Sequence, residues 1–371
     1  MKLSKKKKIR VVRLSGKIYN AGDGKEINKE PVLKELHLEI SKFNNRTKPT
    51  DLRNIALFPS FSEFGSEVVS VLYCIPYYLR NVYPGYYAIA AGWYGRGFLY
   101  QHLVDEFWHL PQDVNWLRDY CRAFHHVSRN LHHLEKKIWK LGRFVHYDLL
   151  AHVLVNEVFP NLKKYKEIAS WPNLDSLDYV EPINKYLTPN SVGIIARNRI
   201  TYGRNLPYSF YLDLISLLKS KGYEVVWLGE EASTYNCPQG LAVDYRSSPE
   251  AKDLRNTLAL VKNLKFTIQF YTASSRLAGL VGTPFIIFES PDQLWGFGQE
   301  GIRLELCSKG NRKIIASDFK LMYDNPEKAI SLVQLAVEEL EAGNYNDNIE
   351  LVADKGEVEI MRTAWQEKYK C

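Results

Sequence analysis

The sequence predicts an α/β protein of two domains, each built on a parallel β-sheet. Its 371 residues, 46% hydrophobic and 25% charged, suit two globular domains of roughly 150–200 residues each. Segments of strand and helix character alternate along the chain, which indicates βαβ units. The expected strands are continuous apolar runs, and such runs are typical of a parallel sheet that helices cover on both faces.

In the N-terminal half, we expect a strand over residues 54–59, a helix over 67–80 and a second strand over 86–91. A glycine-rich turn, Gly92 to Gly97, follows. Residues 105–150 are rich in aromatic side chains and histidine, and we expect them to be mainly helical.

The second α/β series begins after a proline-interrupted stretch, Trp171 to Asn190, where we place the domain boundary. Its expected strands cover residues 192–196, 224–228, 266–270, 285–288 and 312–316, and its expected helices cover 209–220, 250–262, 274–280, 326–342 and 357–369. The expected domains are therefore a basic arm (1–50), an N-terminal domain (51–180), a C-terminal domain (190–325) and C-terminal helices (326–371).

Charge is unevenly distributed along the chain. Residues 1–50 carry 14 Lys and Arg against 5 Asp and Glu, whereas the whole chain has a net charge of +7. Such an arm can contact an anionic membrane surface or nucleic acid, or it can be a solvated tail that aids solubility; the sequence leaves both open. Five scattered cysteines form no Cys-x-x-Cys pair, and no long apolar run is present, so we expect a cytoplasmic protein, in contact with a membrane at most peripherally.

The loop after the expected strand 192–196 is basic. It contains Arg197, Arg199 and Arg204 around Gly203. Ligands of open parallel sheets bind beyond the carboxyl ends of the strands. Arginine offers planar, paired donors that match phosphate oxygens, so the loop is a candidate diphosphate clamp, the alternative being an ordinary solvated loop.

Two further strands end at candidate ligand groups. Ser274 and Ser275 follow the strand 266–270 and open a short helix, where hydroxyl groups and free backbone amides favour phosphate; a simple helix cap is the alternative. Glu289 follows the strand 285–288 and could accept hydrogen bonds from sugar or ribose hydroxyl groups, although it could equally be a cap.

Two carboxylates follow the first strand of the N-terminal half. Glu63 and Glu67 flank Gly65 at the expected start of a helix. Transfer to a hydroxyl group with inversion needs a general base, and Asp or Glu is the usual choice. We therefore take Glu67 as the first candidate for the catalytic base and Glu63 as the second. Acidic residues are also common in a first helical turn for electrostatic reasons.

The sequence does not contain the motifs of several other kinds of functional site. The chain contains no Asp-x-Asp, no Gly-x-Ser-x-Gly and no phosphate loop with Gly-Lys-Ser/Thr, and its glycine turn at residues 92–97 does not match a dinucleotide fingerprint. His125, His126, His132 and His133 do not follow a zinc-ligand pattern. We expect no metal and no resident cofactor.

Residues 192–288 resemble the donor-binding domain of GT-B glycosyltransferases of the heptosyltransferase type. The resemblance rests on the strand segment Gly222–Gly229 and most specifically on Leu277-Ala278-x-x-x-Gly282-Thr283-Pro284. The loop 197–204 is also similar to the arginine loop of GT-B fucosyltransferases. Residues 54–92 match more loosely, and two positions depart from the family pattern: Thr272–Ser275 replaces an Asp-Ser-Gly turn, and Ser66-Glu67 follows the N-terminal glycine in place of Asp.

This resemblance implies two Rossmann-like domains facing across a cleft. It also implies metal-independent transfer of a sugar from a nucleotide-sugar co-substrate to a glycan or other hydroxyl acceptor. The last helix would cross back to the N-terminal domain, and its apolar face (Val358, Met361, Ala364 and Trp365) suits such packing. Two other functions on the same fold remain open: a non-catalytic module that binds sugar or nucleic acid, and a sugar-nucleotide epimerase.

Overall fold

The computed structural model describes eleven segments of the chain: residues 18–19, 26–27, 54–60, 72–109, 143–144, 181–198, 205–270, 276–289, 312–315, 326–344 and 349–352. The chain divides into two compact units, Met1–Leu174 and Asp175–Cys371. Each unit holds its own parallel sheet, so the predicted α/β class is confirmed. The predicted last helix, 357–369, lies outside the described residues.

The first unit contains a four-stranded sheet in the order β5-β4-β3-β6, and all neighbouring strands are parallel. Its strands are β3 (Ile55–Ser60), β4 (Tyr87–Gly92), β5 (Glu106–His109) and β6 (Arg143–Phe144), with helix α4 (Leu72–Asn81) between β3 and β4. A short 3-10 helix, Gly97–Leu99, connects β4 to β5. Two-residue strands β1 (Ile18–Tyr19) and β2 (Glu26–Ile27) pair antiparallel within the basic segment.

The prediction that residues 105–150 are mainly helical is wrong where the structure describes them, at β5 and β6. Aromatic side chains favour a pleated, half-buried surface, and β5 carries two of them, Phe107 and Trp108. Trp108 is buried, and the ring of Phe107 lies 4.9 Å from that of Tyr100. Residues 106–109 therefore form an edge strand that pairs with β4.

The second unit contains a seven-stranded, fully parallel sheet in the order β13-β12-β11-β10-β7-β8-β9. The strands are β7 (Ser191–Ile195), β8 (Glu224–Trp227), β9 (Val243–Asp244), β10 (Thr267–Phe270), β11 (Phe285–Glu289), β12 (Arg312–Ile315) and β13 (Ile349–Val352). The helices are α9 (Tyr208–Ser220), α10 (Leu254–Lys262), α11 (Arg276–Val281) and α15 (Pro326–Glu341). The central strands β7 and β10 are buried at every residue, as expected for a parallel sheet that helices cover on both faces.

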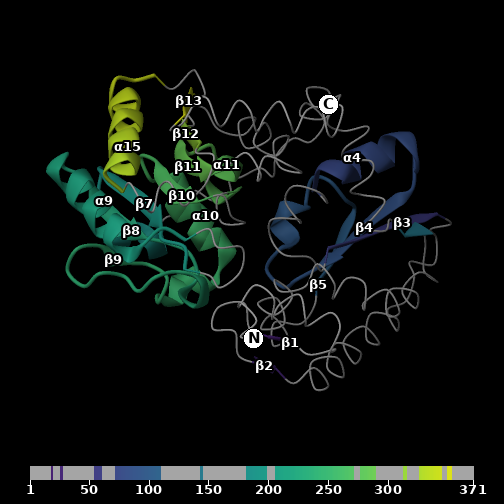
Figure 1. Ribbon diagram of the computed structural model, residues 1–371. Helices are drawn as coiled ribbons and strands as arrows, with labels where there is room; N and C mark the ends of the chain where they lie inside the picture. Colours follow the sequence, from purple (N-terminus) through teal and green to yellow (C-terminus); the bar gives the residue numbers. More distant parts are fainter. Residues whose placement is uncertain are drawn as a thin grey trace, which may run out of the picture. The chain divides into compact units, whose positions relative to one another are not determined.

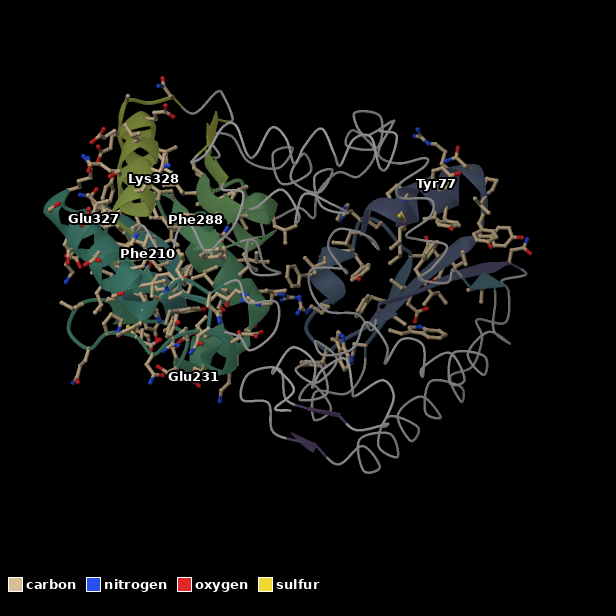
Figure 2. The ribbon with its side chains drawn as sticks, viewed as in Figure 1. Tyr77, Phe210, Glu231, Phe288, Glu327 and Lys328 are labelled. Carbon is tan, nitrogen blue, oxygen red and sulfur yellow. The ribbon has the colours of Figure 1, made fainter. Side chains whose placement is uncertain are left out.

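Helices α9 and α15 lie side by side over one face of this sheet, and α10 and α11 contact each other over the other (Figure 1). The main core lies under α9 and α15. There the ring of Phe210 from α9 meets the ring of Phe288 from β11 edge to face, with centroids 5.7 Å apart (Figure 2). Ala329, Val333 and Val337 of α15 complete the same core at helical spacing.

Local chemistry sets the ends of two helices. Gly222, at φ +80°, ends α9 in the left-handed region, and the Tyr223 amide donates to the Leu218 carbonyl across the turn. The predicted helix 250–262 is broken: a 3-10 helix, Pro249–Lys252, precedes α10, because the Asp253 side chain accepts from the Arg255 amide and caps a new start. A further 3-10 helix, Glu181–Tyr186, lies in the proline-interrupted stretch where the domain boundary was expected.

Candidate functional site

The order of the second sheet marks where a ligand is expected. Counting along the chain, β7, β8 and β9 add outward on one side, and β10 to β13 add outward on the other. The winding therefore reverses between β7 and β10, which are neighbours with Ile195 opposite Gln269. The crevice beyond the carboxyl ends at such a reversal is the usual ligand site of open parallel sheets. The basic loop that was predicted from the sequence begins directly after β7.

Arg197 is the first arginine of that loop and is only 3% exposed. Its Nη1 donates a hydrogen bond to Oδ1 of Asn205 at 2.7 Å. Arg197 and Asn205 lie on either side of residues 199–204, so this bond joins the two ends of the loop. Arg199 and Arg204 lie outside the described residues, and their predicted role stays a prediction.

A neighbouring segment, residues 233–235, pairs with the start of the loop. Arg197 and Thr234 form an antiparallel bridge. The Asn198 amide donates to the Ser233 carbonyl at 2.9 Å, and the Tyr235 amide donates to the Ala196 carbonyl at 2.8 Å. The backbone at the carboxyl end of β7 is therefore held by the connection that follows β8.

Arg246 holds this segment through hydrogen bonds to Thr234 and Tyr235, and the sequence analysis did not identify it as part of the site. Its side chain is 4% exposed, and it forms an ion pair with Asp244 at 2.8 Å. Nη1 donates to Oγ1 of Thr234 at 2.8 Å and to the Tyr235 carbonyl at 2.6 Å. Burial acts to raise the pKa of Asp244, but the hydrogen bonds and charge of Arg246 outweigh burial and hold that pKa below its usual value.

The other predicted donor-site residues are described only in part. Ser274 and Ser275 lie outside the described residues. Glu289 is the last residue of β11, at the carboxyl edge of the sheet, where it was expected; the placement of its side chain is not described. The carboxyl ends of β7, β10 and β11 thus lie at one edge of the sheet. Among the predicted donor-site residues, Arg197 is the one whose side chain the structure describes.

The segment Leu277–Pro284, which carries the most specific family match, has a structural role. Leu277, Ala278 and Leu280 are buried. Gly282 at φ +78° ends α11, and the Thr283 amide donates back to the Ala278 carbonyl at 3.0 Å. The Thr283 hydroxyl donates to the Val261 carbonyl at 2.8 Å and so ties α11 to α10. This motif fixes the helix that begins near the carboxyl end of β10.

In the first unit, β3 ends at Ser60, and the candidate bases Glu63 and Glu67 lie outside the described residues. The described carboxyl edge is that of β4 and β5. A turn with Gly95 at φ +78° follows β4 and buries Arg96. The exposed ring of Tyr94 meets the ring of His109, at the end of β5, edge to face at 5.2 Å.

The described segments bring together no group of three or more His, Cys, Asp or Glu side chains that could hold a metal ion. The histidines at 125–133 lie outside them. Within the part of the chain that the structure describes, no helix has both the length and the apolar character needed to cross a membrane.

Comparison with solved structures finds glycosyltransferases. A glycosyl transferase family 9 protein from Veillonella parvula DSM 2008 is 10% identical, with a TM-score of 0.47 over 80% of this chain and 100% of that chain. ADP-heptose lps heptosyltransferase II from E. coli is 13% identical, with a TM-score of 0.49 over 78% of this chain and 99% of that one. E. coli heptosyltransferase WaaC with ADP is 12% identical, with a TM-score of 0.46 over 76% and 99%.

No protein-family model matches the sequence, and no curated protein matches it. The solved structures include proteins of the heptosyltransferase type, the type that residues 192–288 resemble in sequence.

Proposed function

We propose that this chain is a glycosyltransferase that moves a sugar from a nucleotide-diphosphate sugar to a hydroxyl group of a glycan, lipid-linked or other acceptor. One observation carries the proposal: the arginine loop begins at the carboxyl end of β7, where the winding of the sheet reverses. That is the position at which open parallel sheets bind ligands, and guanidinium groups match the oxygens of a diphosphate.

The chemistry of the proposed transfer needs two things from the protein. Positive charge must stabilise the diphosphate as it leaves, and Arg197, Arg199 and Arg204 are the proposed source, in place of a metal. A carboxylate must accept the proton of the attacking hydroxyl group, and Glu67 or Glu63 is the proposed base. Ser274, Ser275 and Glu289 are proposed to bind the donor beside the arginines.

Ligand binding can be tested before the acceptor is known. Thermal unfolding is followed with ADP, GDP, UDP and CDP, and with the four matching nucleosides. A ligand at 100 times its dissociation constant adds about 2.7 kcal/mol to the free energy of unfolding, which is readily detected. We expect stabilisation by at least one diphosphate and much less by its nucleoside. If none of the diphosphates stabilises the protein, the proposal is wrong.

Turnover then separates the transferase from its alternatives. Nucleotide sugars of the base identified by binding are incubated with the protein, with and without hydroxyl acceptors, in EDTA and in Mg²⁺. We expect release of nucleoside diphosphate that increases with acceptor and is unchanged by EDTA. An altered sugar nucleotide formed without acceptor would indicate an epimerase, and binding without turnover would favour a non-catalytic module. Activity lost in EDTA and restored by Mg²⁺ would contradict metal independence.

A further inference from the structure

Thr234 is the junction between the connection after β8 and the arginine loop after β7. Its backbone forms the antiparallel bridge with Arg197. Its hydroxyl group, which is buried, donates to the Glu230 carbonyl at 2.7 Å and accepts from Nη1 of Arg246 at 2.8 Å. The hydroxyl thus acts both as a donor and as an acceptor in fixing the segment with which the loop is paired.

All three guanidinium nitrogens of Arg246 donate hydrogen bonds that fix this segment and Asp244. Nε and Nη2 donate to the two carboxylate oxygens of Asp244, at 2.9 and 2.8 Å. Nη1 donates to Thr234 and to the Tyr235 carbonyl. A guanidinium group whose three nitrogens all donate to protein oxygens fixes the positions of those oxygens, and it is not a phosphate ligand.

The close approach of Gly229 shows how tightly Thr234 is held. Gly229 lies two residues after β8 and has φ +106°. A Cβ atom built there would lie 2.6 Å from Cγ2 of Thr234. Only a glycine leaves room for the threonine methyl group at this position. Thr234 is therefore fixed by contacts on its hydroxyl, its methyl group and its backbone.

We propose that Thr234 and Arg246 are positioning residues for a diphosphate-binding arginine loop: they hold the backbone at Arg197 so that the loop can bind the diphosphate of a nucleotide sugar. This inference rests on the proposed function. The physical reason is that a loop held in its binding conformation does not lose conformational freedom when the ligand binds. Loosening Thr234 should therefore weaken diphosphate binding although neither residue touches the ligand.

A matched pair of variants tests this. Thr234→Val and Thr283→Val each replace a buried threonine by its apolar isostere, and each removes a hydroxyl that donates to a backbone carbonyl, that of Glu230 or Val261. Thr283 lies at the amino edge of the sheet, before β11, and Thr234 at the carboxyl edge. Both variants should lose stability, so stability alone does not distinguish the two sites.

The probe is inorganic pyrophosphate, titrated by calorimetry together with the nucleoside diphosphate that stabilises the wild type and with its nucleoside. We expect Thr234→Val, which removes the bond to Glu230 and the bond from Arg246, to weaken pyrophosphate and diphosphate binding by about fivefold to tenfold. Nucleoside binding should be nearly unchanged. Thr283→Val should leave all three affinities within about twofold, and Thr234→Ser, which keeps the hydroxyl, should restore most of the loss.

Arg246→Lys supplies a second measurement that does not depend on the folding of Thr234→Val. Lysine keeps the charge but not the planar, forked donor group, so a loss of affinity would reflect positioning and not net charge. Its control is Arg255→Lys, at an exposed position on α10. Equal affinities in Thr234→Val and Thr283→Val, or in Arg246→Lys and Arg255→Lys, would overturn the inference while leaving the proposed function intact. A wild-type protein that binds neither pyrophosphate nor any nucleoside diphosphate would overturn both.

Discussion

Nη1 of Arg197 donates to Oδ1 of Asn205 at 2.7 Å, and this bond closes the arginine loop at its base. Because Arg197 is buried and charged, the bond should contribute more than a neutral hydrogen bond, about 1.5–3 kcal/mol. A double-mutant cycle with Arg197→Ala, Asn205→Ala and the double variant, followed by urea unfolding, measures it. We expect a coupling energy of about 1.5–3 kcal/mol; additive effects of the two substitutions would show that the contact contributes nothing to stability.

Arg199→Ala should affect ligand binding selectively. A charge-assisted bond to phosphate contributes about 1.5–3 kcal/mol, which corresponds to roughly 10–150-fold in affinity. We expect a loss of that size for the nucleoside diphosphate and almost none for the nucleoside, measured by calorimetry. Arg255→Ala, at an exposed position on α10, is the control for the lost charge. An equal loss for nucleoside and diphosphate would show that Arg199 maintains the loop's structure instead.

The central strands were predictable because each is a short segment rich in apolar residues between clear breaks. β7, β8, β10 and β11 were all expected within two residues of their bounds, and burial on both faces is the physical reason. The strands that were missed are peripheral. β9 has only two residues, and β13 interrupts its apolar residues with Glu350, so neither carries a strong pattern.

The candidate site was predictable only where its residues are consecutive. The arginine loop could be identified because it directly follows a recognisable strand, and position after a strand is enough to assign it to the ligand edge. The support formed by Thr234, Asp244 and Arg246 has no such signal. Asp244 and Arg246 lie at and just after a two-residue strand, ten or more residues beyond Thr234, and only the fold brings them to the segment that pairs with Arg197.

Gly229→Ala should be much more destabilising than Gly240→Ala. Both glycines have positive φ, +106° and +74°, so alanine carries a backbone cost of about 1–2 kcal/mol at each. A Cβ at residue 240 meets nothing within 4 Å, whereas at residue 229 it meets Cγ2 of Thr234. Overpacking adds about 1–3 kcal/mol, so chemical unfolding should show a difference of that size. Equal costs would mean that Thr234 moves aside freely.

Glu67→Gln should abolish most turnover without weakening donor binding. A general base contributes typically 10²–10⁴-fold to rate, and glutamine keeps the shape but cannot accept the proton. The measurement is nucleoside diphosphate release at saturating donor, beside calorimetry with the donor alone. Glu63→Gln is the paired variant, since these two carboxylates are the candidates from the sequence. If both variants, and the double variant, retain wild-type rates, the base lies elsewhere.

Glu250 should make stability depend on pH below about pH 4.5. Its Oε1 accepts from Nζ of Lys185 and its Oε2 from the Tyr186 hydroxyl, each at 2.8 Å. These bonds, that of Lys185 first, hold the pKa of Glu250 to about 2, from an ordinary 4.5. The folded protein therefore binds this proton less readily than the unfolded chain, so the contribution is complete above about pH 4.5 and is lost as the pH falls towards 2.

The comparison with Glu250→Gln isolates that contribution from the other carboxylates. We expect the wild type to exceed the variant in free energy of unfolding by a constant amount near neutral pH, and the difference to shrink between about pH 4.5 and 2. Glu231→Gln, which removes one exposed carboxylate (Figure 2), controls for the change in net charge. Because both partners of Glu250 lie in the 3-10 helix Glu181–Tyr186, their contact fixes the segment that leads into β7. A difference that stays constant down to pH 2 would show that this contact does not hold the segment in solution.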